Sequence, residues 1–493
     1  MPHSLAAQIE ALAPQLIAWR RDFHRHPEQG WTEFRTASLV AESLDALGYQ
    51  VAVGEAVVDR EARLGVPDAA TLADALARAR DQGGVARWLT AMEGGLTGVV
   101  GTFDTGRPGP TLAYRFDLDA LPIRESEADT HVPARLGFRS CHPGSMHACA
   151  HDGHTALGLG LAHLLPALAS RLSGRIKLLF QPAEEGVRGA GAMVAAGVVD
   201  DVDHFIATHL GLGQPEGTLI CGADGFLATT KLDVTFTGRA AHAGGEPEKG
   251  RNALLAAAQA VQALHAIAPH AGGASRLNVG RLEAGSGRNV IADTAFMQLE
   301  TRGSTTAIND YVEGRAREVL EGAARMQGVE LTIARLGAAV ECASSPALVE
   351  RIATTLEGRA GIRELITHDT TPAGSEDATL LMRRVIERGG EAAYLIFGTR
   401  LAAGHHHPEF DFDEADPGAD AGGAGEHRAG TRRRDSGCRR TRTSRIALSR
   451  YAAGCVDTAW VRARWPPAWP RRATASADRR ACRGPAPRRR RRR

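Results

Sequence analysis

Several features that define whole classes of protein are absent from this sequence. No run reaches the roughly 18 consecutive apolar residues that mark a membrane-spanning helix, which argues against a transmembrane protein. Residues 4–12 have the pattern of an amphipathic helix and not of a secretory signal peptide. There is no internal repeat, and Gly285-Ser-Gly is too short and wrongly positioned for a phosphate-binding loop. These absences favour a globular protein, and the length fits two domains.

Lysine is absent from residues 417–493, although this segment holds 22 arginines, three of the seven cysteines and three of the six tryptophans. Natural basic tails that bind nucleic acid mix Lys with Arg, so we treat such a tail as the alternative interpretation. The bias towards Arg, Ala, Pro and Gly is typical of a GC-rich gene read out of frame. We therefore interpret residues 416–493 as a disordered, Arg-rich frameshift product without a catalytic role.

Positive charge is scarce outside this tail. The whole chain has a net charge of +2, and residues 417–493, with 22 Arg and five acidic residues, contribute +17. Residues 1–416 therefore carry −15. An acidic body gives no reason to expect binding to nucleic acid or to an anionic membrane.

A pair of carboxylates follows a short apolar segment. Residues 175–180 read as a buried strand, which Pro182 ends, so that Glu184 and Glu185 lie on a loop at the strand's end. Open α/β sheets place their chemistry at this position. Adjacent residues of an extended segment point in different directions, so one Glu can bind a metal while the other acts as a general base. An exposed acidic turn is the alternative.

Cys149 and His151 are two residues apart, which puts them on one face of an extended segment. Asp152 is a candidate cap for a helix over about 154–165. Cys, His and carboxylate side chains bind divalent metals, and His209 and the run His405–His407 add further candidates. Taken singly, these residues are a small buried cysteine, a core histidine and a solvated loop. The combination with a strand-end Glu pair favours a metal site.

The motifs around these residues resemble those of a known family, the amidohydrolase branch of the aminoacylase and carboxypeptidase family of co-catalytic metallohydrolases. The likeness runs from about residue 5 to 415. The segments that carry it are Met146-His-Ala-Cys-Ala-His-Asp152, Pro182-Ala-Glu-Glu185, His209-Leu210, Gly238-Arg-Ala-Ala-His-Ala243, Gly374-Ser-Glu-Asp377 and His406-His-Pro-Glu-Phe-Asp-Phe-Asp-Glu414.

The resemblance implies a set of functional residues. Counting back from Phe410-Asp-Phe-Asp selects His406 rather than His405 or His407. Glu184 would be the general base, and His242 would stabilise the oxyanion, in this family often across a dimer interface. Asn289 and Arg302 would bind substrate. The implied metal ligands are Cys149, His151, Glu185, His209 and His406.

The same resemblance implies an activity and its partners. The expected reaction is metal-dependent hydrolysis of the amide of an N-acyl amino acid, first of all p-aminobenzoyl-glutamate. A hippurate-like or indole-acyl conjugate is an alternative substrate, and an inactive, metal-stabilised regulatory or binding subunit is an alternative role. Two divalent metals, Mn with Zn as the other option, are the expected cofactors. The expected assembly is a dimer, and a further expected partner is a paralogous B subunit.

Two departures from the family pattern stand out. Ala150 replaces the usual Gly between the ligand Cys and His, and a left-handed backbone at this position would cost about 1 kcal/mol or more. After residue 415 the family continues into an apolar helix, whereas this chain enters the Arg-rich tail. With one of the four cysteines before residue 416 committed to metal, a disulfide framework is not expected, and a reducing cytoplasm fits.

The order of elements predicts an α/β fold with one domain inserted into another. Residues 229–237 alternate as a half-buried strand, 252–261 and 309–327 read as helices, and 295–301 and 329–336 read as strands. This succession suits a ferredoxin-like α+β lid or dimerisation domain over 223–338. The discontinuous metallohydrolase catalytic domain then comprises 1–222 and 339–415, because His406 lies beyond the insertion.

Overall fold

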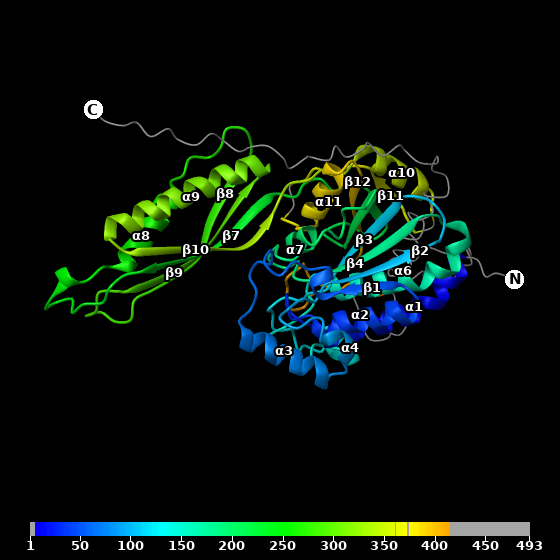
Figure 1. The fold of residues 1–493 in the computed structure, drawn as a ribbon, viewed down its shortest axis with the longest axis horizontal. Helices are drawn as coiled ribbons and strands as arrows, with labels where there is room; N and C mark the ends of the chain where they lie inside the picture. Colours follow the sequence, from blue (N-terminus) through cyan, green and yellow to red (C-terminus); the bar gives the residue numbers. More distant parts are fainter. Residues whose placement is uncertain (1–4, 360, 372–373, 415–493) are drawn as a thin grey trace, which may run out of the picture.

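A computed structural model describes residues 5–359, 361–371 and 374–414. Most of the chain forms an eight-stranded mixed sheet in the order β1-β2-β4-β3-β5-β12-β6-β11 (Figure 1). Neighbours β3, β4, β5 and β12 run parallel at its centre. The strands are β1 Gln50–Val53, β2 Val99–Asp104, β3 Thr111–Asp117, β4 Arg175–Gln181, β5 His204–Leu210, β6 Thr218–Ile220, β11 Glu364–Ile366 and β12 Glu391–Phe397.

Helices cover both faces of this sheet, which is why its central strands are buried along almost their whole length. Helices α1, α2 and α6 lie on one side and α7, α10 and α11 on the other (Figure 1). Gly158 of α6 allows the closest approach, since a Cβ there would lie 2.5 Å from the Phe180 ring. The helices are α1 Leu5–Arg25, α2 Phe34–Ala46, α5 Val132–Leu136, α6 His151–Leu164, α7 Ala190–Ala195, α10 Pro346–Leu356 and α11 Ala378–Glu387.

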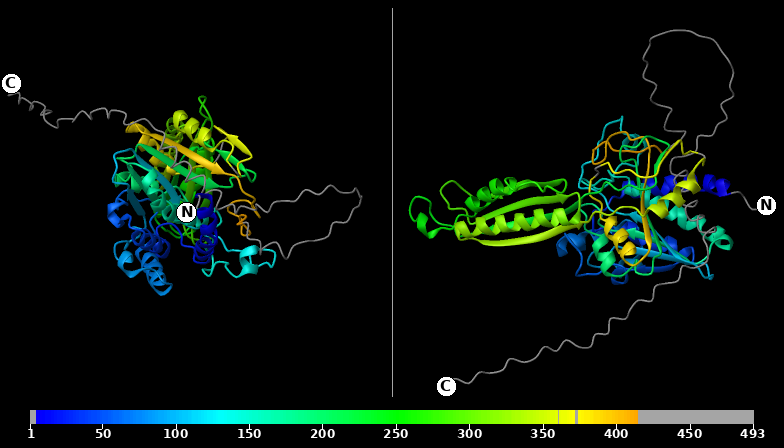
Figure 2. Two further views of the ribbon diagram at one scale, coloured as in Figure 1. Left: turned by 90° about the vertical axis from the view of Figure 1, so that its right-hand side faces the viewer. Right: turned by 90° about the horizontal axis from the view of Figure 1, so that it is seen from above.

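A second, four-stranded antiparallel sheet is inserted between β6 and β11 and extends away from the large sheet (Figures 1 and 2). Its strand order, β10-β7-β9-β8, and its chain order, β7-α8-β8-β9-α9-β10, are those of a ferredoxin-like unit. Apolar residues of one sheet face pack against the two helices. The elements are β7 Ala228–Thr237, α8 Ala253–His265, β8 Ser275–Ala284, β9 Thr294–Gly303, α9 Thr306–Gln327 and β10 Glu330–Ala339.

The structure confirms the predicted α/β fold with an inserted α+β unit, and every strand and helix predicted within that unit. Sequence reasoning missed β8, an edge strand in which no residue is buried, so that its apolar alternation is weak. The proposed division into 1–222, 223–338 and 339–415 remains our proposal. The tail proposed over 416–493 lies outside the described residues.

The helix after Cys149 differs from the prediction. It begins at His151, three residues earlier than expected, and Asp152 is not its N-cap. The residue before the helix is Ala150, whose φ of 70° is in the left-handed region. The structure therefore has the backbone that favours Gly here, and Ala costs about 1 kcal/mol of strain.

Residues 54–96 form a largely helical excursion between β1 and β2. It contains α3 Ala69–Asp81 and the short α4 Ala86–Leu89. Trp31 is buried beneath it and donates a hydrogen bond from Nε1 to the Leu64 carbonyl at 2.7 Å. Among the described helices, none combines the length and the apolar character that crossing a membrane would take.

Candidate metal and active site

The predicted metal ligands come from four segments that follow the central strands. Because β3, β4, β5 and β12 are parallel, their carboxyl ends meet at one edge of the sheet. Glu184 and Glu185 follow β4, His209 is near the end of β5, and His406 follows β12. The loop that ends in Cys149 and the first turn of α6 complete this edge.

The loop that carries Glu184 and Glu185 is held by two buried carboxylates. Asp119 accepts hydrogen bonds from the backbone N–H groups of Glu184 at 3.0 Å and Glu185 at 2.9 Å. Glu33 accepts one at 2.7 Å from the N–H of Ala183, a residue whose φ of 51° is again left-handed. These bonds satisfy the donors of a tight, buried turn and hold both Glu side chains in the cluster.

Three of the predicted ligands lie in direct contact. The Sγ atom of Cys149 is 3.5 Å from Nε2 of His209, and one ligand atom from each of Cys149, His151 and His209 lies within 4.8 Å of the others. His151 donates from Nδ1 to the Asp119 carbonyl at 2.8 Å, and His209 donates from Nδ1 to the Leu210 carbonyl at 2.7 Å. Both hydrogen bonds leave an Nε2 lone pair free, which is the tautomer that a metal ligand requires.

Between neighbouring histidines, the geometry favours His406. Its Nε2 lies 3.7 Å from Oε1 of Glu185, and the pair forms a group with Cys149 that could hold an ion. His405 accepts a hydrogen bond at Nε2 from the Leu212 N–H, 3.0 Å away. Its proton is therefore on Nδ1, which faces Cys149 Sγ at 3.5 Å and has no lone pair to offer.

The donor set suits a divalent metal. His151 Nε2 and Glu185 Oε1 are buried and have no hydrogen-bond partner within the described part of the chain, a costly arrangement unless a cation satisfies them. Burial raises the pKa of Glu185 to about 7 and raises the pKa of the Cys149 thiol, and burial lowers the pKa of His209. Each shift opposes charge on the side chain, and a bound cation would reverse it for the two acidic groups.

Glu184 lies beside this group without being surrounded by it. Its Oε2 is 3.9 Å from Nε2 of His151, and its carboxylate is also close to Glu376 and Asp377. Burial raises the pKa of Glu184 well above that of an ordinary glutamate, and the negative charges of Glu376 and Glu185 raise it further. A carboxylate with a raised pKa is suited to taking up and returning a proton near neutral pH.

A buried polar network behind the cluster was not predicted. Arg115 donates to Asp117 at 2.7 Å and to Glu376 at 3.0 Å, and Asp117 accepts from Nδ1 of His154 at 2.6 Å. Asp377 accepts from the N–H groups of Gly189 and Ala190, which ties α11 to the Glu184 loop. The available signal was charge inside apolar segments: Arg115 and Asp117 interrupt a strand that is otherwise apolar.

A second network joins the two ends of the described chain. Arg20 of α1 is fully buried and donates to Asp152 at 2.8 Å, Asp411 at 2.6 Å and Glu414 at 2.8 Å. His24 donates to the same Asp152 carboxylate at 2.8 Å. Asp152 thus serves this network instead of capping α6, and the segment after His406 is fastened to α1.

Replacing Arg20 by Met should lower the free energy of unfolding of the catalytic part by about 3–5 kcal/mol, because three carboxylates lose their shared cation inside the protein. Urea unfolding followed by circular dichroism measures this. Arg25→Met is the control, since that exposed arginine bonds through its side chain to the Gly137 carbonyl and should change stability by less than about 1 kcal/mol. Equal effects in both variants would contradict the buried role of Arg20.

The residues predicted to bind substrate are divided between two places. Arg302, near the end of β9, lies beside the catalytic part, with its Nη1 3.5 Å from Ser375 Oγ. His242 and Asn289 lie at the opposite end of the inserted sheet, where the Asn289 carbonyl accepts from Ala243. Ten residues of β7 separate that end from the large sheet, about 30 Å of extended chain. His242 therefore does not reach the cluster of its own chain.

The tautomer of His242 nevertheless fits the role predicted for it. Its Nδ1 accepts hydrogen bonds from the N–H groups of Gly244 at 3.1 Å and Gly245 at 3.0 Å. The proton of the neutral ring is therefore on Nε2, which can donate to a developing negative charge.

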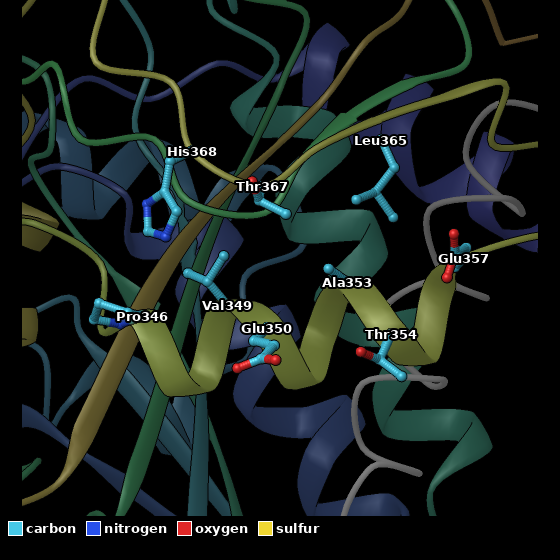
Figure 3. Close-up of a pocket in the computed structure, with 9 residues that line it drawn as sticks. All are labelled: Pro346, Val349, Glu350, Ala353, Thr354, Glu357, Leu365, Thr367 and His368. Carbon is cyan, nitrogen blue, oxygen red and sulfur yellow. The ribbon is translucent and has the colours of Figure 1, made fainter.

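A cavity of about 310 Å³ lies elsewhere, between α10 and the segment after β11 (Figure 3). Val349 and Ala353 of the helix face it, together with Leu365 and His368 from the other side. None of the predicted ligands lines it. The cavity is therefore separate from the metal cluster.

Comparison with known proteins agrees with the geometry of the cluster. Residues 113–422 match the model of peptidase family M20/M25/M40. An indole-3-acetyl-aspartic acid hydrolase from Enterobacter agglomerans is 58% identical over 82% of this chain and 93% of its own length. One subunit of the p-aminobenzoyl-glutamate hydrolase of Escherichia coli is 57% identical over 83% of this chain and 94% of its own length.

Solved structures give the same result. A crystal structure of an aminobenzoyl-glutamate utilization protein from Klebsiella pneumoniae matches with a TM-score of 0.73 and 54% identity, covering 80% of this chain and 94% of the other. A dinuclear metal-binding M20 peptidase from Bacillus subtilis shares the fold, with a TM-score of 0.58 and 23% identity over 92% of this chain and 98% of its own. On the family model and on these identities, the chain belongs to peptidase family M20/M25/M40.

Proposed function

We propose that this chain hydrolyses the amide bond between an aromatic acyl group and an acidic amino acid, with p-aminobenzoyl-glutamate as its substrate. Indole-3-acetyl-aspartate is the second candidate, because a relative named for its hydrolysis is as similar to this chain as the relative named for p-aminobenzoyl-glutamate. Both compounds join an aromatic acid to an amino acid with two carboxylates. The proposal concerns this shared chemistry first and the individual compound second.

The observation that carries the proposal is the pairing of a free carboxylate with a cluster of metal-binding side chains. Glu184 Oε2 is 3.9 Å from His151 Nε2, and both groups are buried. We assign the metal-holding role to Cys149, His151, Glu185, His209 and His406. A divalent metal held there would lower the pKa of water and polarise the amide carbonyl.

In the proposed mechanism the chain's own residues handle the protons. Glu184 removes a proton from the attacking water and delivers it to the leaving amino nitrogen, so that the amine departs neutral. Asp119 keeps Glu184 and His151 in position through their backbone and ring contacts. The buried surroundings exclude other water and strengthen these interactions.

Substrate binding would use the inserted unit. Arg302, beside the Glu376 loop, would pair with a substrate carboxylate. Because His242 and Asn289 lie too far from the cluster of their own chain, we assign their role to the site of a second protomer in a dimer. The partner would be a copy of this chain or a paralogous B subunit, in keeping with the name of the Escherichia coli relative, which describes it as one part of a hydrolase with more than one kind of chain.

We further propose Mn²⁺ as the working metal, with Zn²⁺ as the alternative that a thiolate ligand accommodates. The described cysteines are free thiols, which agrees with a reducing compartment such as the cytoplasm. A substrate containing p-aminobenzoyl-glutamate would place the reaction in the breakdown of folate.

The purified chain, loaded with Mn²⁺ or Zn²⁺, should release p-aminobenzoate from p-aminobenzoyl-glutamate in a steady-state assay by liquid chromatography. Parallel assays use indole-3-acetyl-aspartate and hippurate, each with and without a B-type paralogue. Indole-3-acetate as the faster product would select the second candidate. A metal-loaded chain that cleaves none of these amides, alone or with the paralogue, would instead support an inactive metal-stabilised binding subunit.

A further inference from the structure

Lys231 is one of only three lysines in the chain. The ammonium group of Lys177 bonds to Asp201 and to the Val198 carbonyl, and Lys249 pairs with Glu246. Lys231, half-buried on β7, forms no hydrogen bond and no ion pair with any residue that the structure describes. A partly desolvated cation without an anion is unfavourable, so its position suggests a missing partner.

The strand register fixes the surroundings of Lys231. Lys231 lies directly opposite Glu300 on β9, and Thr229 lies opposite Arg302. Opposite residues of an antiparallel pair share a face, so Lys231, Glu300 and Arg302 are on the same side of the sheet, away from α8 and α9. Glu300 is already paired with Arg302, at 2.9 Å from its Nε. The three side chains together retain one positive charge.

This end of the sheet adjoins the metal cluster. Arg302 Nη1 is 3.5 Å from Ser375 Oγ, and the next residue, Glu376, is close to Glu184. The charge of Lys231 is felt by two of the proposed ligands. Burial raises the pKa of Glu185, and Lys231 is among the charges that oppose this rise; burial lowers the pKa of His406, and His151 and Lys231 lower it further.

We propose that Lys231 is a specificity-determining residue whose ammonium group binds one of the two carboxylates in the amino-acid half of the substrate. Arg302 then receives the other carboxylate, and the two cations select aspartate or glutamate conjugates over those of neutral amino acids. This inference rests on the function proposed above. It adds a residue that the sequence motifs did not single out and a reason for preferring acidic amino acids.

The test compares p-aminobenzoyl-glutamate with two analogues that each replace one carboxylate by an amide, p-aminobenzoyl-glutamine and p-aminobenzoyl-isoglutamine. In the full chain loaded with metal, Lys231→Met should lower kcat/KM for the glutamate compound by about 10- to 100-fold, mainly through KM. For the analogue that lacks the carboxylate bound by Lys231, the same substitution should change kcat/KM by less than about threefold, because the contact is already missing.

Two further variants control the experiment. Lys231→Arg keeps the charge and should restore most of the selectivity, whereas Lys249→Met removes an exposed charge from the same unit and should change nothing. Metal content is measured for every variant. Equal losses on all three substrates, or a loss of metal in Lys231→Met, would assign Lys231 to the cluster itself and overturn the proposal, as would unchanged selectivity.

The outcome separates this inference from the proposed function. If the wild-type chain cleaves no substrate, the proposed function fails, and calorimetry then measures binding of the same three compounds to wild type and Lys231→Met. Tighter binding of p-aminobenzoyl-glutamate than of one analogue, lost in Lys231→Met, would still support the carboxylate contact. Absence of any binding to the wild-type chain would overturn it.

Discussion

Substitution of Glu184 by Gln is expected to lower kcat by about 10²- to 10⁴-fold while the metal content stays at the wild-type level. The amide of Gln fills the same space but cannot accept a proton. Burial and the neighbouring carboxylates raise the pKa of Glu184, which suits proton transfer rather than permanent charge. Stopped assays of amide cleavage give kcat, and elemental analysis gives the metal bound per chain.

The neighbouring residue supplies a matched control. Glu185→Gln removes a carboxylate of the same length from the same loop, but its unpartnered Oε1 faces the cluster and lies 3.7 Å from His406. We therefore expect this variant to lose metal as well as activity. Loss of metal from Glu184→Gln, or a metal-loaded Glu184→Gln enzyme with near-normal turnover, would show that Glu184 is not the base.

Replacement of Cys149 by Ala should remove bound metal and with it essentially all activity. Its Sγ lies 3.5 Å from His209 Nε2 and belongs to two of the groups that could hold an ion. Burial raises the pKa of the thiol, so a metal must displace its proton and then keeps the thiolate in place. Without sulfur, the remaining side chains lose the one ligand that both groups share.

Cys141→Ala is the comparison, since it changes the same residue type in the same loop. Cys141 is exposed, and its sulfur lies 4.0 Å from Gln82 Nε2, outside the cluster. This variant should retain metal and activity. Dialysis against a metal-free buffer, followed by elemental analysis, compares the two; similar metal content in both variants would mean that the ligand set is wrong.

The network around Arg115 shows why sequence reasoning stopped at the ligands. A metal-binding motif is visible because its residues are close together in the chain or match a family pattern. Arg115, His154 and Glu376 are far apart in sequence, and their contacts arise only when β3, α6 and α11 pack together. The same holds for Lys231, whose importance depends on which strand end adjoins the catalytic part.

Elements at the edge of the fold were also harder to predict than those in the core. The strands β3 and β4 are buried on both faces, so continuous apolar residues indicate them. The edge strand β8 has no such signal, because solvent covers much of it. The start of α6 was misplaced because left-handed Ala150 turns the chain abruptly before His151, a conformation that Ala rarely adopts.

The sequence by itself determined the fold class, the insertion and the chemical nature of the cluster, because apolar periodicity and ordered motifs are local properties of the chain. Only the tertiary structure distinguished His406 from His405, since that choice depends on a hydrogen bond from Leu212 that fixes the proton on His405. It also decided that His242 lies about 30 Å of extended strand away from the cluster of its own chain. Distances and proton positions follow from how distant segments meet, and no single stretch of sequence contains them.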